Sequence, residues 1–231
     1  MLKIEDYSFL FLAQSFREGK PSSPLLYWSD FLADEEAIAS AKRHIKEIRT
    51  KKYSIGRKEA NPLTLDLHHA VTSLSAELYQ KDIHFLMELI QNAEDNEYEE
   101  GVEPTLEFVM TKKDITGSGA PATLLVFNNE VGFSRKNMDS ICSVGCSTKK
   151  GKRQQGFIGE KGIGFKSVFL VSSQPWIFSN GYCVRFTEES NQYCGIGYVV
   201  PEFVTRFVKN MQCVRVKQDL AHNYICPSSK A

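Results

Sequence analysis

Hydrophobic residues recur with two different spacings along this chain, and the change of spacing separates a part expected to be helical from a part expected to contain strands. Between residues 64 and 78 the apolar positions return every three or four residues, which is the period of an amphipathic helix. These positions are Leu67, Val71, Leu74 and Leu78. A segment from Asp30 to about residue 49 carries acidic residues before basic ones, an order that suits the helix dipole. We expect a helix in each segment, capped by Asp30 in the segment that begins there and by Thr64 in the segment 64–78, and a third helix capped by Asp82.

The third expected helix contains the stretch MELIQNAEDN, residues 87–96, whose polar residues share one side. Glu88, Asn92 and Asp95 are spaced by four and three positions, so they return to one face of a helix. The opposite face holds Ile83, Leu86, Leu89, Ile90 and Ala93. Such a stripe is typical of a solvated helix face, but an amide between two carboxylates also suits the wall of a polar pocket. The helix alone does not choose between these interpretations.

After residue 104 the pattern changes to short runs rich in β-branched and aromatic residues. TLEFVMT (105–111) and TLLVFN (123–128) are expected strands, and WIFSNGYCVRF is an expected hairpin that turns at Asn180 and Gly181. Short helices are expected after Ser134, which can cap one, and at FKSVFLV (165–171). Residues 1–29 are aromatic-rich without a clear period. Helices followed by strands favour an α+β sandwich.

Composition limits the function classes without choosing one. The chain has 231 residues, 42% of them hydrophobic, which is enough for one sizeable core. Its 28 basic and 28 acidic residues balance, so there is no direct signal for nucleic-acid or membrane binding. The six cysteines form no C-x-x-C pair, and no apolar run approaches the ~18 residues of a membrane span. We therefore expect reduced thiols and an intracellular location.

A glycine-rich loop, GFIGEKGIGFKS (156–167), is the segment best suited to approach a phosphate. Gly159, Gly162 and Gly164 leave room for backbone N–H groups to contact phosphate oxygens. A flexible surface loop would have the same glycine-rich composition. It is not a P-loop, because Phe165 separates the last glycine from Lys166, and it is not a Rossmann fingerprint, because no strand precedes it. The basic run before it is either a solvated loop or charge beside a triphosphate. That run comprises Lys149, Lys150, Lys152 and Arg153.

A third polar feature ends the expected strand TLLVFN. Asn128 is followed by NEVGFS, in which Gly132 permits a tight turn. An amide at the end of a strand can be presented to the base of a ligand. A strand that simply ends in a turn explains the same residues.

Together, the segments ELIQNAED, NNEVGF and GEKGIGF occur in this order between residues 88 and 165. They resemble the N-box and the two glycine boxes of the GHKL ATPase superfamily, which includes gyrase B, histidine kinases, MutL and the ninety-kilodalton heat-shock chaperone. The longer stretches DLHHAVTSLSAELYQKDIHFLMELIQNAEDNEY and SICSVGCSTKKGKRQQGFIGEKGIGFKSVFLV are similar to its sacsin-type and plant NO VEIN-like branch. The resemblance spans roughly residues 35–205.

The resemblance implies a Bergerat fold, a two-layer α/β sandwich with a mixed sheet that holds ATP between a helix and a lid. Glu88 matches the residue that polarises the attacking water, and Asn92 matches the ligand of Mg²⁺. Asn128 matches the acceptor for the adenine amino group. The remaining matched positions contact the nucleotide or form the lid and its hinge: Asp95, Gly132, Lys149, Gly159, Gly162, Gly164 and Phe165.

Two departures from the family pattern bear on function. Asn128 and Glu130 stand where the family usually has Asp and Gly, so adenine selection is expected to be weaker or shared. Few strand-like residues follow residue 205, so we expect a fold that is short at its C-terminal end, as in a fragment or a short isoform. The expected division is a helical extension at 1–60, the ATP-binding domain at 61–205 and an irregular tail at 206–231.

These observations lead to two hypotheses about function. The first is a module that binds ATP with Mg²⁺ and hydrolyses it slowly to drive a conformational switch, with unnamed protein partners and a nucleotide-dependent dimer. The second is a pseudo-ATPase that holds partners without turnover; the presence of both Glu88 and Asn92 favours the first. A histidine kinase is not favoured, because no segment resembles the phosphoacceptor helix. Family analogy places the protein in the nucleus or cytoplasm.

Overall fold

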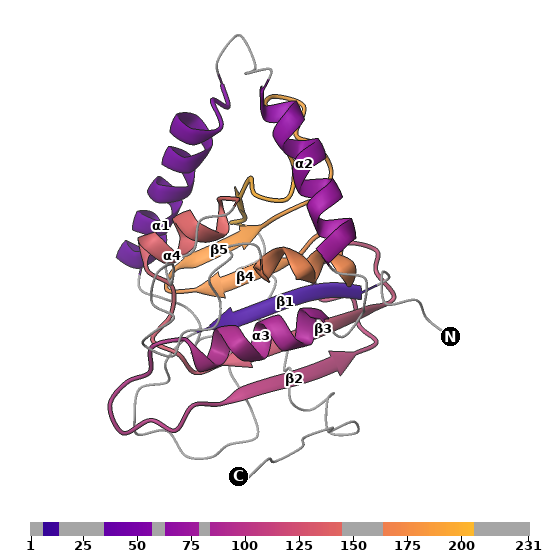
Figure 1. The fold of residues 1–231 in the computed structure, drawn as a ribbon. Helices are drawn as coiled ribbons and strands as arrows, with labels where there is room; N and C mark the ends of the chain where they lie inside the picture. The colour runs from indigo at the N-terminus through magenta and orange to yellow at the C-terminus, as the bar shows by residue number, and fades with distance from the viewer. Residues whose placement is uncertain (1–6, 14–34, 57–62, 79–83, 145–163, 206–231) are drawn as a thin grey trace, which may run out of the picture.

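The computed structural model describes residues 7–13, 35–56, 63–78, 84–144 and 164–205, and the structural statements that follow concern these residues (Figure 1). They combine helices with a single mixed sheet, so the fold is α+β, as expected. None of the described helices is long and apolar enough to cross a membrane.

The sheet has six strands and contains both parallel and antiparallel pairs. They are β1 (Tyr7–Ala13), β2 (Leu106–Thr111), β3 (Ala122–Asn128), β4 (Trp176–Ser179), β5 (Tyr182–Arg185) and β6 (Glu202–Phe203). Their order in the sheet is β2-β3-β1-β4-β5-β6. β1 is parallel to both of its neighbours, and the other pairs are antiparallel. The two strands expected near residues 105–128 are confirmed as β2 and β3.

The centre of the sheet is β1, a strand that the sequence pattern does not predict. Its residues read YSFLFLA; Phe9 lies opposite Leu124 of β3, and Leu10 opposite Trp176 of β4. A strand between two parallel neighbours typically reads as a continuous apolar run, so the polar–apolar alternation that marks a surface strand is missing. Residues 1–60, expected to form a helical extension, thus contribute the central strand of the same sheet.

The helices follow the expected pattern with local differences. They are α1 (Glu35–Glu47), the π-helix η3 (Ile48–Lys52), α2 (Leu63–Leu78), α3 (His84–Glu94), α4 (Arg135–Ile141) and the 3₁₀-helix η5 (Gly164–Leu170). Ser134 caps α4 as predicted, because its hydroxyl accepts a hydrogen bond from the Asn137 N–H. Thr64 lies inside α2, so its prediction as a cap is wrong. Asp30 and Asp82 lie outside the described residues.

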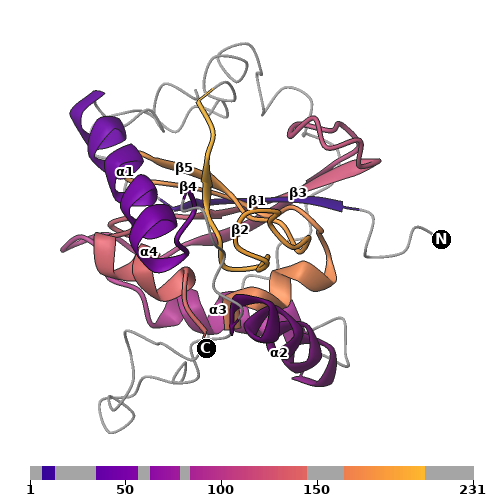
Figure 2. The same ribbon diagram turned by 90° about the horizontal axis from the view of Figure 1, so that it is seen from above.

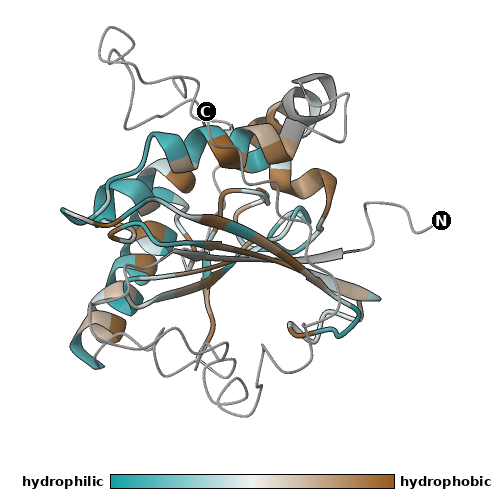
Figure 3. Cartoon of the chain, turned by 90° about the horizontal axis from the view of Figure 1, so that it is seen from below, coloured by the Kyte–Doolittle hydropathy of each residue, from teal (hydrophilic) through white to brown (hydrophobic). Residues whose placement is uncertain are grey.

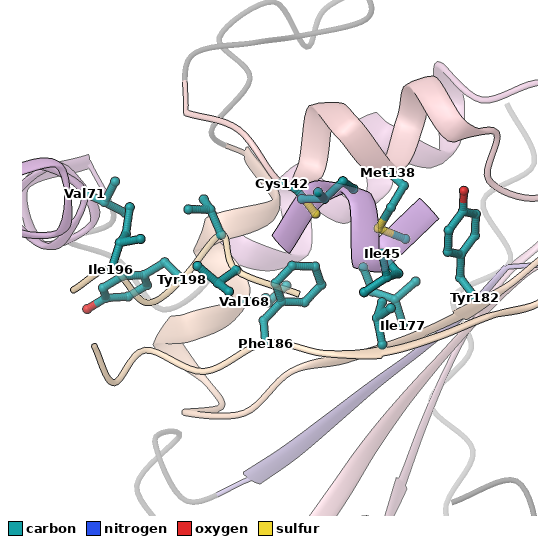
Figure 4. Packing of buried hydrophobic residues seen from close by; sticks show 14 of the residues in the cluster. Ile45, Val71, Met138, Cys142, Val168, Ile177, Tyr182, Phe186, Ile196 and Tyr198 are labelled. Atoms are coloured by element: carbon teal, nitrogen blue, oxygen red, sulfur yellow. The ribbon is translucent and has the colours of Figure 1, made fainter. Parts of the chain in front are cut away.

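Helices and sheet share one hydrophobic core on one face of the sheet. Figure 2 views the sheet nearly edge-on, with α2, α3 and η5 (orange) together on one side of it, and Figure 3 shows helices over the sheet from the opposite direction. In Figure 4, Ile177 of β4 points toward Ile45 of α1 and Met138 of α4, and the same cluster includes Val168 of η5. These four side chains are no more than 1% exposed. The core therefore packs these helices against the sheet.

The β4–β5 hairpin turns at Asn180 and Gly181, as the sequence predicts. Both residues have positive φ, 46° and 78°, which is the conformation that a two-residue hairpin turn requires. Gly181 also lies against α1: a Cβ there would be 2.6 Å from the carbonyl carbon of Ala37. The turn therefore needs glycine for its backbone conformation and for the close approach of the helix.

A buried histidine joins α1, α4 and β5. His44 is 3% exposed; its Nδ1 lies 2.7 Å from the Tyr182 hydroxyl and its Nε2 3.0 Å from a carboxylate oxygen of Asp139. Burial raises the pKa of Tyr182 to about 12, so the phenol stays protonated and donates to Nδ1. The Nε2–H then donates to Asp139. This chain of hydrogen bonds fixes three elements around one side chain.

Substitution His44→Ala is expected to lower the free energy of unfolding by about 1–3 kcal/mol, because it leaves the buried Tyr182 hydroxyl without its acceptor. Urea denaturation followed by circular dichroism measures this loss. His69→Ala is the control, because His69 is exposed on α2, and its effect should stay within about 0.5 kcal/mol. Equal effects of the two substitutions would contradict the role given to His44.

Candidate functional site

Glu88, the first residue of the polar stripe of α3, faces the first residue of η5. Glu88, Asn92 and Asp95 are all partly buried, so the stripe is not simply a solvated face. The carboxylate of Glu88 lies against the backbone of Gly164: a Cβ built on Gly164 would stand 2.2 Å from Glu88 Oε2. The structure therefore brings the predicted catalytic carboxylate to the end of the glycine-rich loop.

Gly164 is required here for space rather than for an unusual backbone angle. Its φ does not lie in the left-handed region, in contrast to Gly132, whose φ is +88°. Any side chain at position 164 would occupy the volume of the Glu88 carboxylate. The close approach of the carboxylate to the glycine backbone is one of the contacts between α3 and η5.

Phe165, expected among the nucleotide contacts, packs toward the core. It is partly buried against the hydrophobic cluster, and its ring centroid lies 6.0 Å from that of Phe186 in an edge-to-face arrangement. This contact holds the first turn of η5 against the sheet. Phe165 therefore positions Gly164.

Asn128 ends β3 and is 2% exposed. Its Oδ1 accepts a hydrogen bond from the Glu130 N–H at 2.8 Å, and its Nδ2 donates to the Tyr98 hydroxyl at 3.0 Å. The first bond is a local turn that begins the loop after the strand. The second joins the strand to the segment that follows α3. The amide expected to contact a base is thus held by two protein contacts of its own.

Tyr98 is a site residue that sequence reasoning missed. Its hydroxyl donates to the carbonyl of Ala93 at 2.6 Å, so it connects the last turn of α3 to Asn128 at the end of β3. Burial raises the pKa of Tyr98, which keeps the hydroxyl protonated at neutral pH. No periodicity marks this residue; the only signal is an aromatic residue within the acidic run NEYEE.

Gly132 is explained by contacts within the protein. A Cβ there would be 2.8 Å from Cγ of Asn180, whose amide donates to the carbonyls of Val131 and Phe133, both at 3.3 Å. The loop after β3 is therefore docked on the turn of the β4–β5 hairpin. Gly132 therefore serves this docking within the protein, and its expected contact with a base stays a prediction.

The ends of α4 and η5 are tied together by buried polar groups. Lys166, which is 3% exposed, donates from Nζ to the carbonyl of Ile141, and the Tyr53 hydroxyl donates to the carbonyl of Cys142. These bonds satisfy carbonyls at the C-terminal end of α4, where positive charge is favoured. Burial raises the pKa of the Cys142 thiol to about 12, so this free cysteine stays protonated, as expected for a reduced thiol.

Several predicted residues fall in the segment between α4 and η5 that is outside the described residues. They are Lys149, Gly159 and Gly162, together with the basic residues Lys150, Lys152 and Arg153. Within the described ranges, no group of three or more His, Cys, Asp or Glu side chains could hold a metal ion. A cation at Asn92 would therefore take most of its oxygen ligands from a bound molecule and from water, which is usual for Mg²⁺.

Comparison with known proteins assigns a family to the part of the chain that carries these residues. The protein-family model for the sacsin domain matches residues 66–218, which include α3, β3, α4 and η5. The chain is 49% identical over 138 residues to Protein NO VEIN of Arabidopsis thaliana. That alignment covers 60% of this chain but only 4% of the relative, and no solved structure matches the chain. Because the family model covers more than half of its length, the chain belongs to the sacsin-domain family.

Proposed function

We propose that this chain is a GHKL-type module with a Bergerat fold that binds ATP with Mg²⁺ and hydrolyses it slowly. The observation that carries the proposal is the contact between Glu88 and Gly164, since it brings a carboxylate of the polar stripe to the end of the glycine-rich loop. The mixed sheet with its helices on one face supports the same fold. ATP and Mg²⁺ are inferred from the chemistry of these residues and from the sequence motifs.

The residues on α3 suit the two tasks that phosphoryl transfer to water requires. Asn92 offers one neutral amide oxygen, which is sufficient when phosphates and waters supply the other ligands of Mg²⁺. Bound Mg²⁺ would neutralise charge on the phosphate oxygens. Glu88 lies one helical turn before Asn92 and would orient a water and accept its proton, a contribution of roughly 10²–10⁴-fold in rate. The Gly164 backbone beside it would limit how far the carboxylate can move.

A pseudo-ATPase is the second candidate, and one observation favours it. Asn128 is 2% exposed, and its amide already makes two protein contacts. A base-binding position that is closed in this way suits a module that changes shape on binding and turns over little. Under both hypotheses we propose a nucleotide-dependent dimer and protein partners, located in the nucleus or cytoplasm. A phosphate-release assay separates the two functions.

Glu88→Ala and Asn92→Ala are expected to have different effects. Glu88→Ala should leave the affinity for Mg²⁺-ATP near that of the wild type and lower the hydrolysis rate by about 10²–10⁴-fold. Asn92→Ala should weaken binding and remove its dependence on Mg²⁺. Calorimetric titration and phosphate release measure the two effects, with Glu94→Ala as the control because Glu94 is exposed on the same helix. Equal loss of affinity in both variants would rule out this division of roles.

Gly164→Ala should act through Glu88. The added Cβ would stand 2.2 Å from Glu88 Oε2, so the carboxylate must move, while the flexible side chain keeps the loss of stability below the ~1–3 kcal/mol typical of overpacking. Hydrolysis is therefore expected to fall at least about tenfold, with affinity for Mg²⁺-ATP retained.

The double variant tests whether these two residues act together. In the Glu88→Ala background the obstructing atoms are gone, so Gly164→Ala should change neither hydrolysis nor stability further. Wild-type turnover in the single Gly164→Ala variant would show that the position of the Glu88 carboxylate does not matter.

A further inference from the structure

Tyr98 connects the helix that carries the polar stripe with the amide expected to meet a base. It follows the end of α3, and its hydroxyl oxygen lies 2.6 Å from the Ala93 carbonyl and 3.0 Å from Asn128 Nδ2. Neither the polar stripe of α3 nor the catalytic role proposed for Glu88 accounts for this residue. Its two contacts determine how Asn128 is oriented.

The protons of these groups can be assigned from their chemistry. A phenol has one proton to donate, and the Ala93 carbonyl can only accept, so the Tyr98 proton points to Ala93. Toward Asn128 the hydroxyl can then only accept, and the group facing it must be the Nδ2 amide. Independently, the Glu130 N–H lies 2.8 Å from the other side-chain atom of Asn128, which must therefore be Oδ1.

Both contacts thus select the same orientation of the Asn128 amide. A flipped amide would set N–H against the Glu130 N–H, and an oxygen against a hydroxyl whose proton is already committed. Among the described residues the Asn128 amide makes no third hydrogen bond. One N–H and one lone pair of oxygen thus remain, each on a defined side.

We propose that Tyr98 is a positioning residue that makes Asn128 selective for adenine over guanine. This inference rests on the nucleotide-binding function proposed above. An edge of adenine presents a donor, the amino group, beside an acceptor nitrogen, which matches one acceptor and one donor of an oriented amide. Guanine has a carbonyl acceptor where adenine has its amino group and an N–H where adenine has the acceptor nitrogen, so it would require the flipped amide. A carboxylate at this position would offer acceptors only and would not need Tyr98 to orient it.

The test compares Tyr98→Phe with the wild-type chain. Calorimetric titrations use Mg²⁺-ATP, Mg²⁺-GTP and Mg²⁺-tripolyphosphate, the last of which has no base. The wild type should prefer ATP, and Tyr98→Phe should reduce the ratio of the two nucleotide affinities by at least about tenfold. Tripolyphosphate affinity should stay within about twofold, because this ligand has no base for Asn128 to read. Tyr193→Phe, at a residue that is 58% exposed, should leave all three affinities unchanged.

Each outcome separates this inference from the function on which it rests. If the wild type binds neither nucleotide, the proposed function fails. If the wild type prefers ATP and Tyr98→Phe keeps that preference, only the role of Tyr98 is overturned. A loss of affinity for tripolyphosphate as well would overturn it too, because Tyr98 would then support the whole fold.

A second variant keeps the proposal open to test if Tyr98→Phe does not fold. Asn128→Leu has a similar volume and no amide to orient, so it should lose the preference for ATP while tripolyphosphate affinity is kept. If Asn128→Leu still prefers ATP, Asn128 does not read the base, and Tyr98 has no amide to position.

In a chain that carries Asn128→Asp, Tyr98→Phe should leave the ratio of ATP and GTP affinities unchanged. A changed ratio there would contradict the proposed orientation of the amide.

Discussion

The candidate site depends on a carboxylate that occupies the space beside a glycine. Glu88 reaches the backbone of Gly164 because residue 164 has no side chain and because Phe165 anchors the next position in the core. This contact joins α3 to η5, and so joins the polar stripe of α3 to the end of the glycine-rich loop. A bulkier residue at position 164 would separate the two elements or displace the carboxylate, and the site would lose its arrangement.

Hydrogen bonds fix the end of β3 and the loop that follows it. Tyr98 joins the end of α3 to Asn128, and Asn180 of the hairpin turn holds the loop around Gly132. The end of β3, the last turn of α3 and the β4–β5 turn are therefore mutually positioned by polar contacts, while the hydrophobic core sets the distance between helices and sheet. Small displacements of one element would be transmitted to the others, which suits a module that changes conformation on binding.

Local signals in the sequence predict much of this fold, while contacts between distant residues escape them. The stripe on α3, the strands β2 and β3, the Ser134 cap and the Asn180–Gly181 turn each follow from residues close together in the chain. The central strand β1 lacks alternation because it has parallel neighbours on both sides, so its pattern does not separate it from other apolar runs. Tyr98 and the packing of Gly132 on Asn180 depend on tertiary contacts that no spacing reveals.

The most direct test of the central claim is amide hydrogen exchange of the whole chain, measured with and without Mg²⁺-ATP. Slower exchange is expected in α3, at the end of β3 and in η5, with no change in α1, which lies against the β4–β5 turn at Gly181. Protection that is absent from α3 and η5, or that appears only in other elements, would contradict the assignment of the nucleotide site to the contact between Glu88 and Gly164.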